Sequence, residues 1–270
     1  MQNNLAVIMS LYKNDKLEFV KLAVESILSQ TYKDFDFFIQ YDGAIRREVD
    51  KYLSNIIDER VKINKRNENK GLAYSLNELL CIVMPMGYEY IARMDADDIS
   101  LSNRFERQIE YFEAHPELEC LGTWAIEITS NGDEYYKKKM PDTNEACLEL
   151  FRKRDPMIHP TVMFRNSYIE KAGLYALDTF FGEDTMMWAQ GFAAGCKLGN
   201  VPEYLFKFRL DNKFFERRRG WKYAKGIWKL RHRVNKMLGF GFVEDCWALA
   251  YATAKMMPKF ILNIIYKTAR

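Results

Sequence analysis

Three carboxylates stand within four residues at the end of an apolar segment. Asp95, Asp97 and Asp98 follow residues 88–94, whose pattern indicates a short buried strand, and precede a helical pattern over 102–112. Carboxylates this close repel one another, and a hard divalent cation with oxygen ligands offsets the repulsion. Such a cation at a strand end is typical of chemistry on a phosphate or diphosphate. The motif alone is weak, because Asp98 is also a candidate cap for the following helix.

Strands and helices alternate around this motif. Strands are expected at residues 5–10, 35–41, 61–64 and 88–94, and helices at 16–29, 48–57 and 71–83. This alternation predicts right-handed βαβ units around a mostly parallel sheet. Ligands of such sheets bind beyond the carboxyl ends of the strands. Ser10, Asp42 and Asp95 end three of these strands and are therefore expected to meet in one crevice.

The second half of the chain is less regular. Strands are predicted at 118–129 and 161–165, a hairpin turn at 130–133, and a helix at 185–194. From Gly220 onward the pattern is typical of long helices. We therefore predict an α/β domain over residues 1–212 and a basic, aromatic helical extension over residues 213–270.

Composition limits the class of protein. The chain has 270 residues, of which 48% are hydrophobic, so one sizeable core with or without an appendage is expected. The apolar run at 5–9 is too short for a signal peptide, and no apolar run reaches the roughly 20 residues of a spanning helix. Five scattered cysteines without a CxxC pair indicate reduced thiols in a cytoplasmic protein. With three histidines, a zinc site is not expected.

Positive charge is concentrated near the C-terminus. Residues 213–236 hold ten Lys/Arg and one acid, which leaves 30 basic and 36 acidic residues elsewhere. A helical wheel places five of these cations on one face: Lys222, Lys225, Lys229, Arg233 and Lys236. The opposite face is apolar except for Arg231, and holds Trp221, Ala224, Ile227, Trp228 and Val234. A solvated face and attachment to an anionic membrane surface are both open, and we favour the membrane. Nucleic-acid binding is not expected, because no nucleic-acid fold signal accompanies the charge.

A series of short motifs runs along the chain in a fixed order. They are AVIMSLY at 6–12, SILSQTY at 26–32, YDG at 41–43, NKGLA at 69–73, ARMDADDIS at 92–100, HPTVMF at 159–164 and the pair Glu183-Asp184. Over residues 5–210 this set resembles the family 2 inverting glycosyltransferases with the GT-A fold. The resemblance implies a Rossmann-like, mostly parallel sheet flanked by helices, and an enzyme of bacterial surface-polysaccharide synthesis.

The resemblance also implies roles for the residues at the strand ends. Ser10, Tyr12 and Asp42 would hold the nucleotide base, with Tyr12 stacking on a pyrimidine and Asp42 accepting from its ring N–H, which favours uracil. Gly71 would let the backbone approach the nucleotide closely, and Asp95 would bind ribose or metal-bound water. The structural alternatives are a half-buried aromatic for Tyr12, a turn residue for Asp42 and a helix-start glycine for Gly71.

Metal and base are the two catalytic elements that the resemblance implies. Asp97, together with Asp95, would bind Mn²⁺ or Mg²⁺, which bridges the two phosphates and neutralises the departing nucleoside diphosphate. Inverting transfer needs one base for the acceptor hydroxyl, and the family places it at Asp184. The helix that begins there favours the ionised form of this carboxylate. The structural alternative is that Asp184 is the N-cap of that helix.

Acceptor contacts are expected from Glu183, His159 and Trp188, whose structural alternatives are an exposed glutamate, a satisfied histidine and a core tryptophan. The predicted donor is a UDP-hexose or UDP-N-acetylhexosamine. The predicted acceptor is a glycan, lipid-linked as in O-antigen or capsule precursors, at the inner face of the bacterial membrane.

Two other functions stay open on the sequence. A sugar nucleotidyltransferase needs a glycine-rich triphosphate loop after the first strand, which residues 10–14 lack. A nucleotide-sugar-binding protein without transferase activity would leave Asp184 remote from the crevice.

Overall fold

The structure is a computed structural model that describes residues 4–179, 181–210 and 219–257. Nine strands of these residues form one sheet, in the order β3-β2-β1-β4-β8-β6-β9-β5, with β7 paired to β6. The strands are β1 (Leu5–Leu11), β2 (Phe35–Asp42), β3 (Val61–Arg66), β4 (Tyr90–Met94), β5 (Ile99–Ser100), β6 (Cys120–Ile128), β7 (Glu134–Lys138), β8 (Met163–Arg165) and β9 (Leu198–Arg209).

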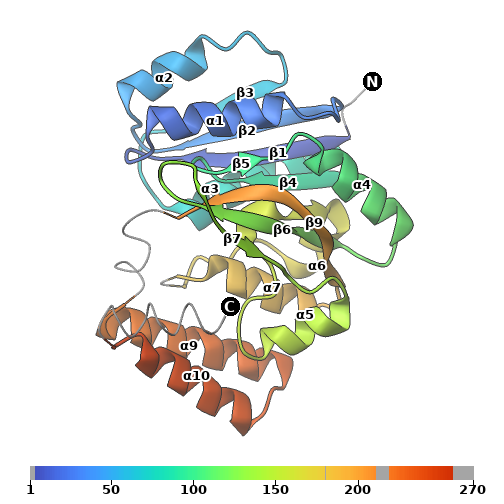
Figure 1. The fold of residues 1–270 in the computed structure, drawn as a ribbon, viewed down its shortest axis with the longest axis vertical. Helices are drawn as coiled ribbons and strands as arrows, with labels where there is room; N and C mark the ends of the chain where they lie inside the picture. Colours follow the sequence, from blue (N-terminus) through green and yellow to red (C-terminus); the bar gives the residue numbers. More distant parts are fainter. Residues whose placement is uncertain (1–3, 180, 211–218, 258–270) are drawn as a thin grey trace.

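Helices cover both faces of this sheet (Figure 1). They are α1 (Leu17–Leu28), α2 (Arg47–Ser54), α3 (Leu72–Val83), α4 (Arg104–Ala114), α5 (Asn144–Phe151), α6 (Asn166–Ala172), α7 (Glu183–Ala193), α9 (Trp221–Leu238) and α10 (Phe242–Ala254). Two short 3₁₀ turns, Met84–Met86 and His159–Thr161, complete the described elements.

The parallel half of the sheet confirms the predicted alternation. β3, β2, β1 and β4 are all parallel, and the register pairs Leu11 with Tyr41 and Asp42 with Arg66. On β4, Met94 pairs with Met9 of β1. Ser10, Asp42 and Asp95 therefore end neighbouring strands at the same edge, as the sequence pattern predicts.

Strand β1 carries apolar side chains on both faces, because helices pack against both sides of the sheet at this strand. Leu5, Val7 and Met9 pack with α1 and α4 in one hydrophobic cluster. Ala6 and Ile8 point to the other side, where they share a cluster with α3, α7 and α9. A strand buried on both faces is a continuous apolar run and not an alternating one.

The second half of the sheet is antiparallel in part. β8 runs antiparallel to β4 and β6, whereas β9 runs parallel to β6 and antiparallel to β5. β6 and β7 form the hairpin predicted around residues 130–133. The predicted strand at 161–165 is shorter than expected, because residues 159–161 form a 3₁₀ turn.

The C-terminal helices α9 and α10 pack beside each other below α7 (Figure 1). The basic side chains predicted for one face of α9 are exposed, whereas Arg231 on the other face is buried. Trp221 and Trp228, which the helical wheel places opposite the basic face, are both exposed. The proposed boundary between residues 212 and 213 lies outside the described residues. No helix within the described ranges is long and apolar enough to cross a membrane.

Candidate active site

The end of β1 brings a further carboxylate to the acidic motif. Asp15 lies in the turn after β1, where its Oδ2 accepts a hydrogen bond of 2.8 Å from the backbone N–H of Tyr12. Burial, helped by the charges of Asp97 and Asp95, raises the pKa of Asp15 to about 7, against the opposing effects of the Tyr12 hydrogen bond and of Arg46. The carboxylates therefore repel one another across two loops, which is a suitable environment for a divalent cation.

Asp98 anchors the acidic motif to strand β9. Its side chain is buried, and its Oδ1 accepts the backbone N–H of Arg209 at 2.7 Å. Burial and the neighbouring Asp97 and Asp95 raise the pKa of Asp98 well above its ordinary value. The helix-cap alternative for Asp98 is wrong, because α4 begins after Asn103.

The guanidinium of Arg209 holds the same loop from the other side. Its Nε donates to the backbone carbonyl of Asp97 at 2.8 Å, and its Nη1 donates to the carbonyls of Thr129 and Ser130. One buried arginine thus connects the acidic motif to the β6–β7 hairpin.

Arg93 lies behind the acidic motif with no solvent exposure. Its Nη2 is 2.8 Å from Oδ1 of Asp95, whereas its Nε and Nη1 have no hydrogen-bond partner in the described parts of the chain. The charge of Arg93 also interacts with Tyr175 and Glu183. A buried cation therefore stands between the strand-end carboxylates and the start of α7.

Asp42 is hydrogen-bonded to the loop before α3. Its carboxylate is 4% exposed and accepts hydrogen bonds from the backbone N–H groups of Lys70 and Gly71, at 2.8 and 3.0 Å. The side chains of Asn69 and Arg66 also donate to it. Both oxygens thus accept hydrogen bonds from the chain itself, and the predicted contact of Asp42 with a nucleotide base stays a prediction. In the structure Asp42 fixes the loop before α3.

Two glycines make this loop possible. Gly71 has φ +93, a conformation that side chains disfavour, and its Cβ position is open. A Cβ on Gly43 would lie 2.8 Å from the backbone nitrogen of Asn69, so the turn after β2 needs glycine to pack against the loop. The open backbone at Gly71 fits the predicted close approach of a nucleotide, which stays a prediction.

Ser10 and Tyr12 lie at the end of β1 on the predicted edge. Ser10 is half-buried, and Tyr12 is 37% exposed. An exposed ring at this edge suits base stacking, and the base-binding role of both residues stays a prediction.

Asp184 lies in the first turn of α7. The N-cap is Gly182, with φ +77, so the alternative that Asp184 is the cap is wrong. The backbone N–H of Thr185 donates to Oδ1 of Asp184 at 2.8 Å. Glu183 and Asp184 both interact electrostatically with Tyr175, which in turn interacts with Arg93. Arg93 and Tyr175 thereby link the acidic motif to the start of α7.

His159 and Trp188 are part of the core. The Nε2 atom of His159 is 2.9 Å from the hydroxyl of Tyr175, and burial lowers the pKa of His159 well below its ordinary value. The ring of Trp188 has no exposure and packs against His159 and Phe164. The prediction that Trp188 is a sugar platform is wrong, because no face of its ring is open. The structure supports the structural alternative for His159 as well.

Comparison of the sequence with known proteins identifies the family of this chain. Residues 6–173 match the family model "Glycosyl transferase family 2". The chain belongs to glycosyl transferase family 2. It is 30% identical over 271 residues to the amylovoran biosynthesis glycosyltransferase AmsE of Erwinia amylovora, covering 98% of both chains. It is also 30% identical to an Escherichia coli UDP-Gal:alpha-D-GlcNAc-diphosphoundecaprenol beta-1,3-galactosyltransferase, covering 97% of this chain and 94% of that one.

Solved structures confirm the fold of this family 2 glycosyltransferase. Staphylococcus aureus TarS 1–349 with UDP-GlcNAc superposes with a TM-score of 0.66 at 12% identity, over 93% of this chain and 72% of that one. The mannosyltransferase PcManGT of Pyrobaculum calidifontis, with GDP-Man and Mn²⁺, gives a TM-score of 0.64 at 13% identity, over 100% and 80%. The predicted GT-A-like α/β fold and the glycosyltransferase class are both confirmed.

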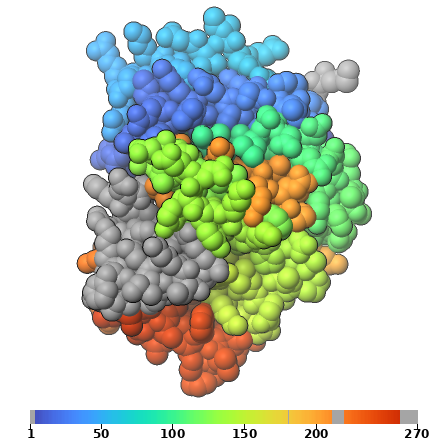
Figure 2. Space-filling model, in the orientation of Figure 1, coloured from blue at the N-terminus to red at the C-terminus, as the bar shows by residue number. Residues whose placement is uncertain are grey.

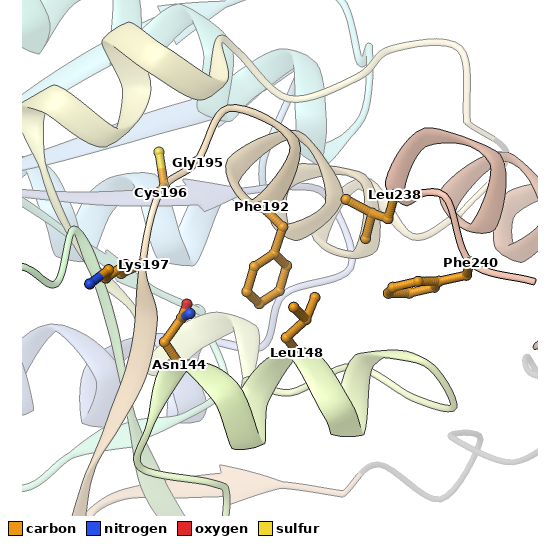
Figure 3. Close-up of a pocket in the computed structure, with 8 residues that line it drawn as sticks. All are labelled: Asn144, Leu148, Phe192, Gly195, Cys196, Lys197, Leu238 and Phe240. Carbon is orange, nitrogen blue, oxygen red and sulfur yellow. The ribbon is translucent and has the colours of Figure 1, made fainter.

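The family 2 domain also has a pocket away from the strand ends. It lies between α5, the end of α7 and the end of α9 (Figure 3). Its lining residues are Asn144, Leu148, Phe192, Gly195, Cys196, Lys197, Leu238 and Phe240. None of them is a predicted site residue, and no carboxylate is among them, so this pocket does not supply the chemistry of transfer.

Proposed function

We propose that this glycosyltransferase is a metal-dependent, inverting enzyme that uses a UDP-sugar. It would move a hexose or N-acetylhexosamine to a lipid-linked glycan acceptor in bacterial surface-polysaccharide synthesis. The observation that carries the proposal is the acidic motif at the strand ends, with Asp95 paired to the buried Arg93, together with Asp184 in the first turn of α7. The names of the E. coli and Erwinia relatives support the donor and the pathway class.

The UDP-sugar donor would bind at the carboxyl ends of β1, β2 and β4. In the described part of the chain, no three His, Cys, Asp or Glu side chains are arranged to hold an ion by themselves. Asp15 adds a further carboxylate beside this loop, and its pKa is raised by burial first and then by the charges of Asp97 and Asp95. Mn²⁺ or Mg²⁺ would be held by Asp97, with diphosphate oxygens and water completing its ligands, and would neutralise the leaving UDP. Asp95 is paired with Arg93, so we assign it to ribose or metal-bound water.

The glycan acceptor would bind at the start of α7. Asp184 would take the proton from the acceptor hydroxyl as its oxygen attacks the anomeric carbon on the face opposite UDP. The bond to UDP breaks as the new glycosidic bond forms, so the configuration inverts without a covalent enzyme intermediate. The first turn of α7 stabilises the ionised carboxylate. Glu183, beside it, would orient the acceptor.

A product assay tests the proposed function. UDP-galactose, UDP-glucose and UDP-N-acetylglucosamine would each be supplied with Mn²⁺ and a synthetic alkyl diphosphate of α-GlcNAc. We expect one donor to give a disaccharide by mass spectrometry, with a β linkage by proton NMR coupling. An α linkage would overturn the inverting mechanism. The donor assignment would be overturned if no UDP-sugar supported transfer or raised the melting temperature of the protein, while a GDP-sugar did both.

The exposed surfaces of α9 and α10 support attachment to an anionic membrane at its cytoplasmic face. The basic side chains of α9 are exposed, and the adjacent helix α10 exposes large apolar side chains, among which Phe242 is 82% exposed. Both acids of α10 are paired with neighbouring cationic or imidazole side chains: Glu244 with Arg152, and Asp245 with His232. The outward faces therefore combine cations with apolar groups, which is the composition of an interfacial helix.

Vesicle binding tests this attachment. A lysine near an anionic surface contributes about 1 kcal/mol, so Lys225→Gln with Lys229→Gln should lower partitioning to phosphatidylglycerol vesicles by about 30-fold. The matched control is Lys21→Gln with Lys51→Gln, on α1 and α2 at the opposite end of the molecule (Figure 2). Sedimentation with vesicles measures the partition. Equal losses in both double variants, or no loss in either, would contradict the assignment of α9.

A further inference from the structure

Helix α9 packs directly on the residues that begin α7. A Cβ on Gly182 would collide with a methyl group of Leu230. Gly182 also has φ +77, which side chains disfavour. The turn that leads into Asp184 is therefore shaped by a side chain of the C-terminal extension, and α7 and α9 share one hydrophobic cluster.

Arg231 adds a polar connection to this packing. The residue is 5% exposed, and its Nη1 lies 3.5 Å from Oδ1 of Asp155. Its Nη2 donates to the backbone carbonyl of Phe151, and its guanidinium lies 5.0 Å from the Phe151 ring. The arginine that interrupts the apolar face of α9 thus reaches the loop after α5.

Asp155 also contacts α7. It accepts the hydroxyl hydrogen bond of Thr185, at 2.9 and 3.0 Å to its two oxygens. The backbone N–H of Thr185 in turn donates to Oδ1 of Asp184 at 2.8 Å. A chain of contacts therefore runs from Arg231 through Asp155 and Thr185 to the carboxylate of Asp184.

We propose that Arg231 is a positioning residue for Asp184, and that α9 completes the geometry of the base. The inference rests on the proposed role of Asp184 in transfer. A buried ion pair is a poor source of stability, because desolvation offsets its attraction and apolar residues of similar size often do better. Arg231 stands where the pattern of α9 calls for an apolar residue. Its ion pair with Asp155 would hold the acceptor of the Thr185 hydroxyl in place, and the backbone N–H of Thr185 would then orient the carboxylate of Asp184.

Two arginine variants separate positioning from general packing. Arg231→Met should lower kcat for transfer by about 10- to 100-fold, while the KM for the UDP-sugar and the Kd for UDP stay within about twofold. Arg152→Met is the matched control, because Arg152 joins the body to Glu244 of α10 at 2.7 Å without touching α7. It should leave kcat unchanged. The assay uses the best donor of the panel above, and circular dichroism with melting curves checks folding.

Thr185 tests the same chain of contacts from its other end. Thr185→Val removes the hydroxyl at constant shape and should lower kcat as Arg231→Met does, whereas Thr185→Ser keeps the hydroxyl and should retain kcat. The double variant Arg231→Met with Thr185→Val should lose little more than either single variant, because both break one network. If Arg231→Met does not fold, the kcat values of Thr185→Val and Thr185→Ser still test whether this network of contacts positions Asp184.

The outcomes distinguish this inference from the function on which it rests. Loss of transfer in Asp184→Asn beside wild-type kcat in Arg231→Met and Thr185→Val would overturn the positioning role and leave the base assignment standing. Retained transfer in Asp184→Asn would overturn the base assignment itself. Equal kcat losses in Arg231→Met and Arg152→Met would mean that α9 acts through packing alone, and would also overturn the positioning role.

Discussion

Asp184→Asn should lower kcat for sugar transfer by about 10²- to 10⁴-fold, the range that a general base contributes. Asparagine keeps the size of the side chain and an oxygen that can accept the N–H of Thr185. It cannot take a proton from the acceptor hydroxyl. Initial rates of disaccharide formation measure kcat, and isothermal titration measures the binding of UDP, which should be unchanged.

Glu183→Gln serves as the comparison for that variant, because Glu183 is the adjacent acid on the same turn of α7. It should raise the KM for the acceptor and lower kcat far less than Asp184→Asn does. If the loss of kcat were larger at Glu183 than at Asp184, the base would be assigned to the wrong member of the pair.

Asp97→Asn should lower metal-dependent transfer by at least about 10²-fold, because the charge that neutralises the leaving UDP is worth several kcal/mol. The variant should need far more Mn²⁺ for half-maximal rate, whereas the wild type should lose activity on EDTA treatment and regain it with Mn²⁺. Full activity of the wild type in EDTA would contradict the metal assignment.

Metal binding should also depend on pH through Asp15. The pKa of this acid is raised to about 7 by burial and by Asp97 and Asp95, with Arg46 opposing. Below that pH Asp15 is protonated, and a cation favours its ionised form. The affinity for Mn²⁺ in the presence of UDP should therefore rise as pH increases through about 7, with proton release on binding. Asp15→Asn should flatten this dependence, and titration calorimetry in two buffers measures it.

The sequence was sufficient for the parallel half of the fold and its binding edge. The apolar run of β1 and the helical spacing of α1 and α3 are local patterns, and their alternation imposes a parallel sheet. Because parallel strands end at one edge, Ser10, Asp42 and Asp95 were assigned together without knowledge of their contacts. The boundaries of these elements agree with the structure to within a few residues.

The missed residues depend on contacts between distant segments. Asp15 meets the acidic motif only because β1 and β4 are neighbours in the sheet, about 80 positions apart in sequence. Arg93 lies two residues before Asp95, near the end of an apolar strand. No local pattern in the sequence shows that its guanidinium is buried. A signal did exist for Arg231, which interrupts the apolar face of α9.

The surroundings of Trp188 and Asp42 also required the tertiary structure. Trp188 lies on α7, whose weakly amphipathic sequence does not reveal which side faces the core, and the structure buries it completely. Asp42 was predicted from its place before Gly43, but its partners come from residues 66–71, which approach only in the folded sheet. Side-chain partners thus required the tertiary structure, although the strand ends did not.

A crystal structure with UDP and Mn²⁺, with the ion located by its anomalous scattering, is the most direct measurement. We expect one Mn²⁺ peak between a carboxylate oxygen of Asp97 and the diphosphate, with the uridine beside Tyr12. The carboxylate of Asp184 should face the open side of the diphosphate, with room for one sugar between them. A Mn²⁺ peak away from Asp97, or a UDP site from which Asp184 points away, would contradict the account.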